Sequence, residues 1–516
     1  MPGDPENDYR RKIKTPEQMR EIIGPRPRAK KVIMCHGTFD LVHPGHIRHL
    51  MYAKSLGDVL IVSLTSDSHI TKADYRPFVP QQLRAMNLAA IEVVDYVVID
   101  NHPKPLENIG YLQPDFFAKG YEYQDGAMPS KTREEMKLVS SYGGEMIFTP
   151  GDVVYSSSKF IERTPPNIST EKLLTLMESE GVTFEGLKRS LDQLRGIRVH
   201  VVGDTIVDSY AYCSVIGSSA TKTPTLSVKL EREVDFAGGA AVVSRHLRET
   251  GAEVRFSTVL GEDNLRDFVL SEMSDHGIDC QPFIERTRVT TQKRVFIASG
   301  HHLLKVDRVD NRPISDRTLE ALAESVSSNK VDGVVFSDFR HGMFNRNTVP
   351  RLVAAIPEGT VRVADSQVAS RWGNILDFQG FDLITPNERE ARFALGDQDS
   401  VVRPLSLELY KRAGCKYLIL KLGDKGIMTY RAPSHDVRSF FGIDSFAVNV
   451  VDPVGAGDAL LAYATLGLIA TRSVAIASIL GTMAAAVACE HEGNRPVAPE
   501  AVLQKLHAVE QQARYS

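Results

Sequence analysis

Two glycine-containing turns of different sequence stand directly in front of predicted helices. His43-Pro-Gly-His46 lies near the start of the chain and Asp452-Pro-Val-Gly-Ala-Gly-Asp458 near its end. Glycine lets the backbone approach a bound group closely, and the N–H groups in the first turn of a helix have no partners within the helix. Each turn therefore predicts a helix N-terminus that binds an anion. Because there are two such turns, we expect two sites on one chain.

The segment around the first turn predicts an α/β domain. Short apolar runs at residues 31–35 and 58–64 flank a helical stretch at 45–56, which is the pattern of a β-α-β unit. Further strand-like runs cover residues 96–99, 116–118 and 145–148. We expect an extension over residues 1–29, followed by a doubly wound, Rossmann-like domain over residues 30–162. Its ligand should lie at the carboxyl ends of the strands.

A second α/β domain is predicted after a break in this pattern. Residues 164–167 read Thr-Pro-Pro-Asn, and the stretch 171–194 is rich in Glu, Lys and Leu, which predicts docking helices within a linker over residues 163–195. Strand-like runs then recur at residues 198–202, 334–336, 361–363, 383–384 and 417–420. They predict one large α/β domain over residues 196–516.

The composition limits the location and the partners. The chain has 516 residues, of which 61 are basic and 65 acidic, so a small molecule is a better expected partner than a nucleic acid. The most apolar stretch, residues 460–488, is interrupted by Thr471-Arg472-Ser473, which predicts two buried helices and no membrane span. The five cysteines show no C-x-x-C spacing, and the first thirty residues lack the apolar core of a signal peptide. We therefore expect a cytoplasmic protein.

The first turn carries two histidines that can act on one phosphate group. His43 and His46 bracket Pro-Gly at the predicted start of a helix, and the run His36-Gly37-Thr38-Phe39-Asp40 ends the preceding strand. Two imidazoles at this spacing can donate hydrogen bonds to charge that develops on a phosphate under attack. The pattern predicts phosphate chemistry at this site.

This segment resembles the nucleotidyltransferase superfamily with the H-x-G-H signature over residues 11–162. The resemblance implies that His43 and His46 are catalytic and stabilise the transition state in which a phosphorylated substrate displaces pyrophosphate from a nucleoside triphosphate. It also implies nucleotide or phosphate binding by the strand-end turn, by K-x-x-x-R-P, by K-G-x-x-Y and by a closing S/T motif. The residues at these positions are Gly37, Thr38, Phe39, Lys72, Arg76, Lys119, Ser156 and Ser157.

The second turn predicts phosphoryl transfer. Gly455, Ala456 and Gly457 leave the N-terminus of the following helix open, so that their N–H groups can bind the oxygens of a phosphoryl group. Asp458 would lie beside this anion hole, where it can take the proton from an attacking hydroxyl group.

The second turn and its surroundings resemble the ribokinase-like (PfkB) sugar kinases over residues 196–511. The resemblance implies that Asp458 is the catalytic base, that a sugar substrate binds to early acidic positions, to the G-G-A-A loop and to a lysine, and that the N-E-x-E motif organises Mg²⁺ indirectly. The implied substrate-binding residues are Asp204, Asp208, Gly238, Gly239 and Lys293; the residues implied for Mg²⁺ are Asn387, Glu388 and Glu390; those implied for the nucleotide are Lys421, Gly423 and Gly426.

Both halves resemble the bacterial bifunctional ADP-heptose synthase family, although their order is reversed here. In the kinase half the likeness includes residues 203–210, 290–294 and 337–339. The Asn that usually follows G-G-A-A in PfkB kinases is replaced by Val242, which leaves the exact sugar open. The family implies that a heptose 7-phosphate is phosphorylated by MgATP and then joined to a nucleotide from ATP or CTP.

Three functions remain open from the sequence. The first is a bifunctional enzyme of nucleotide-sugar synthesis, with sugar phosphates and nucleotides as its partners and a homodimer as the family's common assembly. The second keeps both activities but acts on another sugar, or on a polyol phosphate, with CTP or GTP. The third is a sensor in which one domain has lost catalysis.

Overall fold

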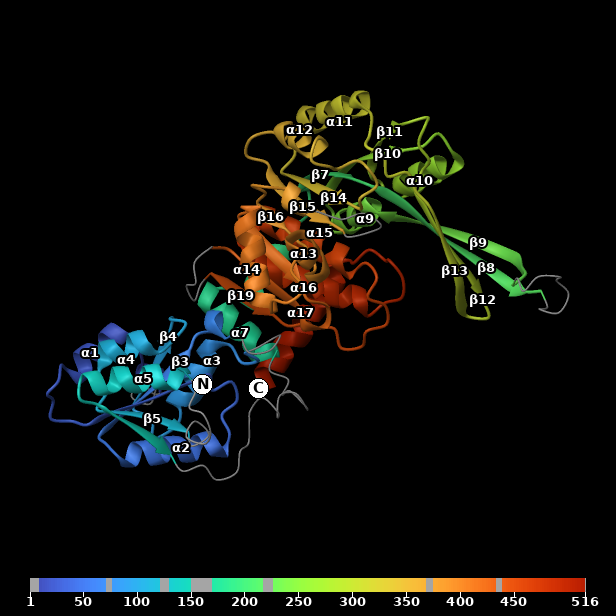
Figure 1. Cartoon of the computed structure of the whole chain (residues 1–516). Coiled ribbons are helices and arrows are strands. Elements are labelled where there is room, and N and C mark those ends of the chain that lie inside the picture. Colours follow the sequence, from blue (N-terminus) through green and yellow to red (C-terminus); the bar gives the residue numbers. More distant parts are fainter. Residues whose placement is uncertain are drawn as a thin grey trace. The chain divides into compact units, whose positions relative to one another are not determined.

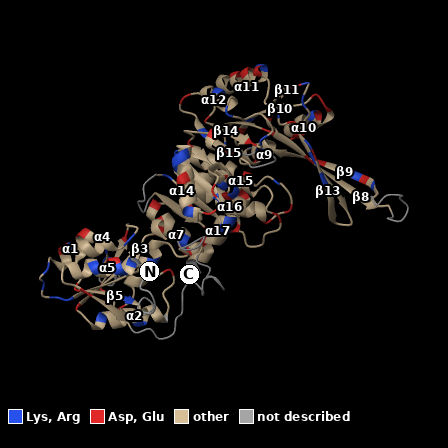
Figure 2. Ribbon diagram, in the orientation of Figure 1, with Lys and Arg blue, Asp and Glu red and all other residues tan. Residues whose placement is uncertain are grey.

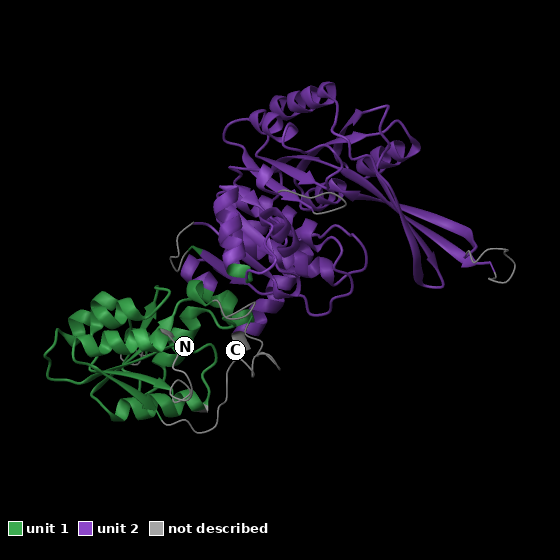
Figure 3. Cartoon of the chain, viewed as in Figure 1, with its two compact units in different colours: residues 1–175, 401–403, 434–439 green, residues 176–400, 404–433, 440–516 purple. Residues whose placement is uncertain are grey.

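The computed structural model describes residues 9–70, 77–120, 130–149, 169–216, 226–367, 375–432 and 439–515. The chain forms two compact units, shown in Figure 3. Unit 1 comprises residues 1–175, 401–403 and 434–439, and unit 2 comprises residues 176–400, 404–433 and 440–516. Both are built on mainly parallel sheets, so the predicted α/β class is confirmed.

Unit 1 is built on a six-stranded parallel sheet with the order β1-β4-β3-β2-β5-β6. Its strands are β1 (Ile13–Lys14), β2 (Val32–Gly37), β3 (Val59–Thr65), β4 (Tyr96–Asp100), β5 (Phe116–Gly120) and β6 (Glu145–Thr149). The chain order reverses between the neighbouring strands β2 and β5. A doubly wound sheet binds ligands beyond the carboxyl ends of its strands at such a point.

The helices of unit 1 cover both faces of this sheet (Figure 1). They are α1 (Pro16–Ile23), α2 (Pro44–Ser55), α3 (Gln81–Ala89), α4 (Leu106–Leu112) and α5 (Ser130–Ser141); a further helix, α7 (Ser169–Glu180), begins in unit 1 and ends in unit 2. Alternate residues of β2 point to opposite faces: Cys35 packs with α2 and α3, and Met34 packs with α1, α4 and α5. Apolar side chains on both faces explain why the strands are nearly continuous apolar runs.

The sheet of unit 1 reaches into the segment expected to be an extension. Ile13 of β1 pairs with Val97 of β4, and Met19 of α1 is fully buried in the core. A two-residue strand and a helix with one buried side chain leave little apolar signal in the sequence. The domain therefore includes residues before 30.

Unit 2 has a nine-stranded sheet with the order β11-β10-β7-β14-β15-β16-β17-β18-β19. The strands are parallel from β11 to β17, and β18 and β19 run antiparallel at one edge. Their bounds are β7 (Arg198–Gly203), β10 (Glu253–Leu260), β11 (Asp279–Ile284), β14 (Gly333–Asp338), β15 (Val361–Ser366), β16 (Leu383–Ile384), β17 (Tyr417–Lys421), β18 (Ile427–Tyr430) and β19 (Phe440–Ile443).

The helices that follow α7 in the sequence include a buried pair, α15 and α16. The full set is α8 (Phe184–Asp192), α9 (Ala240–Glu249), α10 (Asn264–Asp275), α11 (Asp316–Ser328), α12 (Thr348–Ala354), α13 (Glu388–Leu395), α14 (Val402–Ala413), α15 (Ala456–Thr471), α16 (Val474–Cys489) and α17 (Pro499–Tyr515). Arg472 ends α15 in a left-handed conformation and the Ser473 side chain caps α16, which confirms the predicted break. Over the described residues, no helix is both long and apolar enough to cross a bilayer.

A second sheet of unit 2, which we call the lid sheet, was not predicted. Its strands have the order β13-β12-β8-β9 and are β8 (Thr205–Val215), β9 (Val228–Gly239), β12 (Gln292–Ala298) and β13 (His301–Arg308). Figure 1 shows these strands projecting from the body of unit 2. Every residue of β13 is exposed, so the strand has no alternating apolar pattern to reveal it.

Charged residues of both signs are interspersed along the helices of both units (Figure 2). The His43–His46 turn follows the parallel strand β2, and the Asp452–Asp458 turn precedes α15 and lies beside Lys421, near the carboxyl end of β17.

Candidate active sites

In unit 1 two histidine rings stack at the N-terminus of α2. His43 is the N-cap residue, and its Nδ1 accepts a hydrogen bond of 3.1 Å from the Gly45 N–H. The rings of His43 and His46 lie with their centroids 3.9 Å apart and their planes at 27°. Since Nδ1 of His43 is the acceptor, a neutral His43 carries its proton on Nε2. The arrangement brings the two predicted imidazoles together.

Both rings favour the neutral form. Burial, followed by the nearby His43 and His49, lowers the pKa of His46 to about 4. Burial, followed by the charge of Arg48, also lowers the pKa of His43. A Cβ atom at position 45 would lie 2.9 Å from Cε1 of His43, so glycine is needed for this geometry. Two neutral imidazoles at a helix N-terminus can each donate one hydrogen bond to phosphate oxygens.

The turn after β2 is held in place by two buried charged side chains. The Asp40 carboxylate accepts hydrogen bonds from the N–H groups of Phe78 (3.0 Å) and Val79 (2.8 Å). Phe39 has a φ of 45°, and a Cβ atom at Gly37 would lie 3.0 Å from its ring. The predicted residues Gly37, Thr38 and Phe39 therefore form one tight turn beside His46, whose ring centroid is 5.0 Å from that of Phe39.

The second of these charged side chains, Arg84 of α3, was missed in the sequence. Its guanidinium is fully buried and donates to the backbone oxygens of Thr38, Thr65 (2.9 Å) and Val79 (2.8 Å) and to the Asp67 carboxylate (2.6 Å). It thereby joins the turns that follow β2 and β3. A charged residue on the buried face of a helix was the only available signal.

Lys119 is the penultimate residue of β5 and lies at the carboxyl end of this strand. Its Nζ forms an ion pair with Glu135 and donates to Thr132 Oγ1 at 3.3 Å. His36, at the end of β2, lies between Ser63 Oγ (2.9 Å) and Thr65 Oγ1 (3.1 Å), and burial lowers its pKa to about 3. The other predicted residues of this site, Lys72, Arg76, Ser156 and Ser157, lie outside the described residues.

In unit 2 the predicted base, Asp458, lies in the first turn of α15. Gly455 is the N-cap residue with a φ of 81°, and a Cβ atom there would lie 1.7 Å from Oδ1 of Asn494. Glycine is required at this position both by conformation and by space. The N–H groups of Gly457 and Asp458 have no acceptor within the helix, so the turn can bind an anion.

An ion pair lies beside this helix N-terminus. Nζ of Lys421, at the end of β17, is 2.9 Å from Oδ1 of Asp365, at the end of β15. A Cβ atom at Gly457 would lie 3.5 Å from the same Nζ, so the lysine lies next to the turn. Burial, followed by the charge of Asp365, raises the pKa of Asp458 to about 7, and Lys421 opposes the rise. Asp458 can thus exchange a proton near neutral pH.

The N-E-x-E motif forms the start of α13. Asn387 caps the helix and donates two hydrogen bonds to Glu390, from its backbone N–H to Oε2 (2.7 Å) and from its Nδ2 to Oε1 (2.7 Å). Burial raises the pKa of Glu390 to about 7 and Lys421 opposes the rise, so Glu390 lies close to the Lys421 charge. Glu388 instead pairs with Arg392 at 2.6 Å.

Glu390, one of the residues implied for Mg²⁺, belongs to a group of carboxylates around Lys421. Among the described residues, no three His, Cys, Asp or Glu side chains gather closely enough to hold a metal ion. The carboxylates of Asp365, Glu390 and Asp458 each lie close enough to Lys421 to raise its pKa. Indirect binding of Mg²⁺ by Asn387, Glu388 and Glu390 therefore stays a prediction. The predicted Gly423 (φ 61°) and Gly426 (φ 84°) shape the turn between β17 and β18.

The lid sheet brings three of the predicted substrate-binding residues together. Asp208 of β8 pairs in register with Lys293 of β12, and a Cβ atom at Gly238 of β9 would lie 2.3 Å from Oδ2 of Asp208. Burial raises the pKa of Asp208 and Lys293 opposes the rise. The Asp208 charge also raises the pKa of Asp458, so the two carboxylates lie near each other.

Asp204 and Gly239 support the loops around this region. Oδ2 of Asp204 accepts hydrogen bonds from the N–H groups of Phe339 (2.9 Å) and His341 (3.2 Å), in the loop after β14. Gly239, with a φ of 65°, is the N-cap residue of α9, and a Cβ atom there would lie 2.4 Å from the Asp204 backbone oxygen. Val242 is 1% exposed in the first turn of α9.

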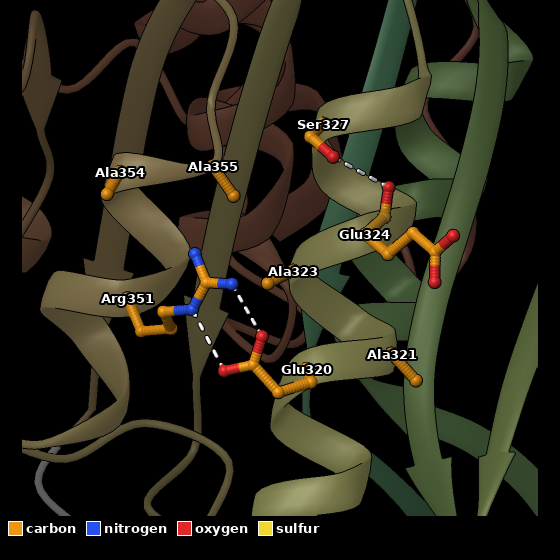
Figure 4. Close-up of a pocket in the computed structure, with 8 residues that line it drawn as sticks. All are labelled: Glu320, Ala321, Ala323, Glu324, Ser327, Arg351, Ala354 and Ala355. Atoms are coloured by element: carbon orange, nitrogen blue, oxygen red, sulfur yellow. Dashed lines mark hydrogen bonds and ion pairs between the residues drawn. The ribbon is translucent and has the colours of Figure 1, made fainter.

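Figure 4 shows a groove of about 510 Å³ between α11 and α12. Glu320 and Arg351 form an ion pair with a shortest distance of 2.5 Å across it, and four alanines also line it. None of the predicted site residues lines this groove.

Comparison with known protein families assigns the larger part of the chain. The pfkB family carbohydrate kinase model matches residues 197–501, which is more than half of the sequence. The chain belongs to the pfkB carbohydrate kinase family. A cytidylyltransferase-like model matches residues 34–163, so the pfkB domain follows a second domain, as the sequence predicted.

Relatives of this chain include proteins named bifunctional protein HldE. The protein of Pelobacter propionicus is 26% identical over 329 residues, which cover 62% of this chain and 65% of that protein. The protein of Syntrophotalea carbinolica is 39% identical over 142 residues, which cover 27% of this chain and 28% of that protein. The chain thus spans less than two thirds of the length of these relatives.

Solved structures support the pfkB fold. A point mutant of phosphofructokinase-2 from Escherichia coli superposes with a TM-score of 0.51 at 17% identity, covering 61% of this chain and 99% of that one. The same enzyme in complex with potassium superposes with a TM-score of 0.50, also at 17% identity and with the same coverage of both chains. At this identity the likeness establishes the fold alone.

Proposed function

We propose that the protein is a bifunctional enzyme of nucleotide-sugar synthesis. Its pfkB domain would phosphorylate the anomeric hydroxyl of a sugar phosphate, and its cytidylyltransferase-like domain would join the product to a nucleotide. The observation that carries this proposal is the presence on one chain of two helix N-termini suited to phosphate, one beside Asp458 and one beside the stacked rings of His43 and His46.

In the kinase step the anomeric oxygen attacks the γ-phosphorus of ATP, its proton passes to Asp458 and ADP leaves. The raised pKa of Asp458, about 7, supports its role as a base near neutral pH. The open turn at Gly455–Gly457 and the ammonium of Lys421 would bind the negative oxygens of the transferring group. Mg²⁺, when bound with ATP, would neutralise part of the phosphate charge.

In the second step an oxygen of the sugar 1-phosphate attacks the α-phosphorus of a nucleoside triphosphate, and pyrophosphate leaves. His43 and His46 would donate hydrogen bonds to the charge that builds up on the α-phosphate. Lys119, together with the predicted Lys72, Arg76, Ser156 and Ser157, would bind the remaining phosphate oxygens. The product of the kinase step is the nucleophile that this step requires.

The proposed kinase substrate is a heptose 7-phosphate, and the proposed nucleotide product is of the ADP-heptose class; it keeps the 7-phosphate unless a separate phosphatase removes that group between the two steps. The relatives named bifunctional protein HldE support two activities on one chain. The cytidylyltransferase-like match makes CTP a second candidate for the nucleotide donor. Because Val242 stands where PfkB kinases usually have Asn, another sugar or a polyol phosphate is a second candidate for the substrate. All candidates share the same two reactions.

The test is product analysis by mass spectrometry. The protein is incubated with heptose 7-phosphate or with each of a panel of sugar and polyol phosphates, together with MgATP, MgCTP or MgGTP. We expect a heptose 1,7-bisphosphate and then an ADP-heptose 7-phosphate, because neither reaction removes the 7-phosphate. Heptose 1-phosphate supplied with MgATP should give an ADP-heptose directly. If a polyol phosphate alone consumes nucleotide, the heptose assignment is wrong; if no compound does, the bifunctional enzyme is wrong.

We also propose a homodimer in the cytoplasm. The lid sheet exposes apolar side chains, of which Leu304 (59% exposed) and Leu230 (53%) are examples, and a second copy could cover them. The five free cysteines support a reducing compartment. Analytical ultracentrifugation should show a dimer for the wild type and a monomer for Leu304→Lys; a monomeric wild type would contradict this.

A further inference from the structure

A buried histidine next to the proposed sugar site has an unused ring nitrogen. His341 lies in the loop after β14 and is 5% exposed. Its Nε2 is buried and has no hydrogen-bond partner among the described residues. We infer that His341 is a specificity-determining residue of the kinase site and that its Nε2 accepts a hydrogen bond from a hydroxyl group of the sugar phosphate. This inference rests on the proposed kinase function.

The loop that carries His341 is fixed on two sides. The backbone N–H of His341 donates to Oδ2 of Asp204 (3.2 Å), and its backbone oxygen accepts from Nη1 of Arg288 (2.8 Å). The next residue, Gly342, has a φ of 97°, and a Cβ atom there would lie 2.0 Å from the Arg312 backbone oxygen. The ring therefore starts from a rigid backbone, as a group that discriminates between substrates requires.

The ring itself is oriented by Asn311. Nδ1 of His341 lies 3.1 Å from the amide oxygen of Asn311, which can only accept a hydrogen bond. With the amide placed in this way, Nδ1 carries the proton of the neutral ring and Nε2 keeps its lone pair. The unpaired atom is thus an acceptor.

Burial and nearby positive charge keep the ring neutral. Burial, followed by the charges of Lys293 and Arg288, lowers the pKa of His341 to about 4. A neutral ring with a lone pair at Nε2 repels phosphate oxygens and attracts hydroxyl protons. A buried acceptor without a partner is costly, which a structure tolerates where a ligand supplies the missing donor.

Lys293 connects His341 to the other candidate residues. Its charge acts on His341 and also on Asp208, the acid beside Gly238 in the lid sheet. Asp208 in turn acts on Asp458, the proposed base. The geometry agrees: the His341 backbone N–H donates to Asp204, and Lys293 pairs in register with Asp208, so His341 is connected to the predicted substrate-binding residues.

Two substitutions of His341 distinguish the role of Nδ1 from that of Nε2. His341→Asn keeps an amide at the position of Nδ1, where it can contact Asn311, and removes the acceptor at Nε2. His341→Gln reaches further and presents an amide oxygen near the position of Nε2. His301→Asn, at an exposed site of β13, is the matched control.

Steady-state kinetics are measured with the sugar phosphate that gives the highest kinase rate in the panel assay. We expect His341→Asn to raise its KM about tenfold, with kcat and the KM for ATP changed less than about twofold, and His341→Gln to recover much of the loss. Among deoxy analogues of the sugar phosphate, one should bind poorly to the wild type and lose nothing further in His341→Asn.

Two outcomes would overturn the inference while leaving the proposed function intact. One is an active wild type for which His341→Asn changes the sugar KM no more than His301→Asn does. The other is an equal loss for the sugar phosphate and for ATP, which would indicate a structural role. If no sugar phosphate is phosphorylated by the wild type, the proposed function and this inference both fail.

Discussion

Replacing Asp458 by Asn should make the protein inactive as a kinase and more stable at alkaline pH. Burial holds the pKa of Asp458 at about 7, well above its ordinary value of 3.8. The carboxyl group is neutral in both the folded and the unfolded chain below about pH 4. Between pH 4 and pH 7 it ionises only in the unfolded chain, which destabilises the fold progressively, and above pH 7 the full cost is present.

The size of the effect follows from the pKa. Each pH unit by which a pKa is raised costs about 1.4 kcal/mol once the group is ionised, so the rise from 3.8 to about 7 corresponds to about 4 kcal/mol. Asp458 keeps part of its surface exposed, and water screens part of this cost. We therefore expect Asp458→Asn to raise the free energy of unfolding of unit 2 by about 2 kcal/mol at pH 8 and by almost nothing at pH 4.

The assay is urea unfolding at pH 4, 6 and 8, followed by hydrogen exchange of the buried strands β14 and β15. Asp424→Asn is the control, because the Asp424 side chain is 82% exposed in the same unit. Kinase kcat should fall at least about a hundredfold in Asp458→Asn. A variant that is no more stable than the wild type at pH 8 would refute the reasoning, whatever its activity.

Three further variants test other parts of the structure. His46→Ala should slow nucleotidyl transfer at least about a hundredfold and leave the kinase rate unchanged, as measured by pyrophosphate and ADP release. Gly455→Ala, whose Cβ would lie 1.7 Å from Asn494, should abolish kinase activity; Gly493→Ala, which has a similar left-handed backbone (φ 75°) but open space around it, should keep much more of it, so that the comparison isolates the clash with Asn494. Arg84→Met leaves the Asp67 carboxylate without its partner and should destabilise unit 1 by about 3 kcal/mol, measured by thermal unfolding; an unchanged midpoint would contradict this.

Most central strands of the two parallel sheets could be predicted because they are buried on both faces, whereas β1, β10 and β11 of these sheets were missed. β3 and β7, for example, are almost continuous apolar runs. The lid sheet could not be predicted in this way. β13 is exposed along its whole length, and its conformation depends on pairing with β12, whose partner residues only the fold reveals.

The motif residues were predictable and their supporting partners were not. His43, His46 and Asp458 stand in turns whose glycines reveal them in the sequence. Asp365 meets Lys421 across 56 positions of the chain, and Arg84 meets Thr38 across 46. Such pairs have no sequence signature, because parallel strands bring their carboxyl ends together wherever the intervening chain runs.

The order of the two proposed reactions can be tested in one experiment. Wild type, Asp458→Asn and His46→Ala are each given heptose 7-phosphate with MgATP and MgCTP, and the products are identified by mass spectrometry. We predict a nucleotide sugar from the wild type, a heptose bisphosphate alone from His46→Ala, and no product from Asp458→Asn unless the bisphosphate is supplied. A nucleotide sugar formed from heptose 7-phosphate by Asp458→Asn would contradict the proposal that Asp458 makes the phosphate that His43 and His46 activate.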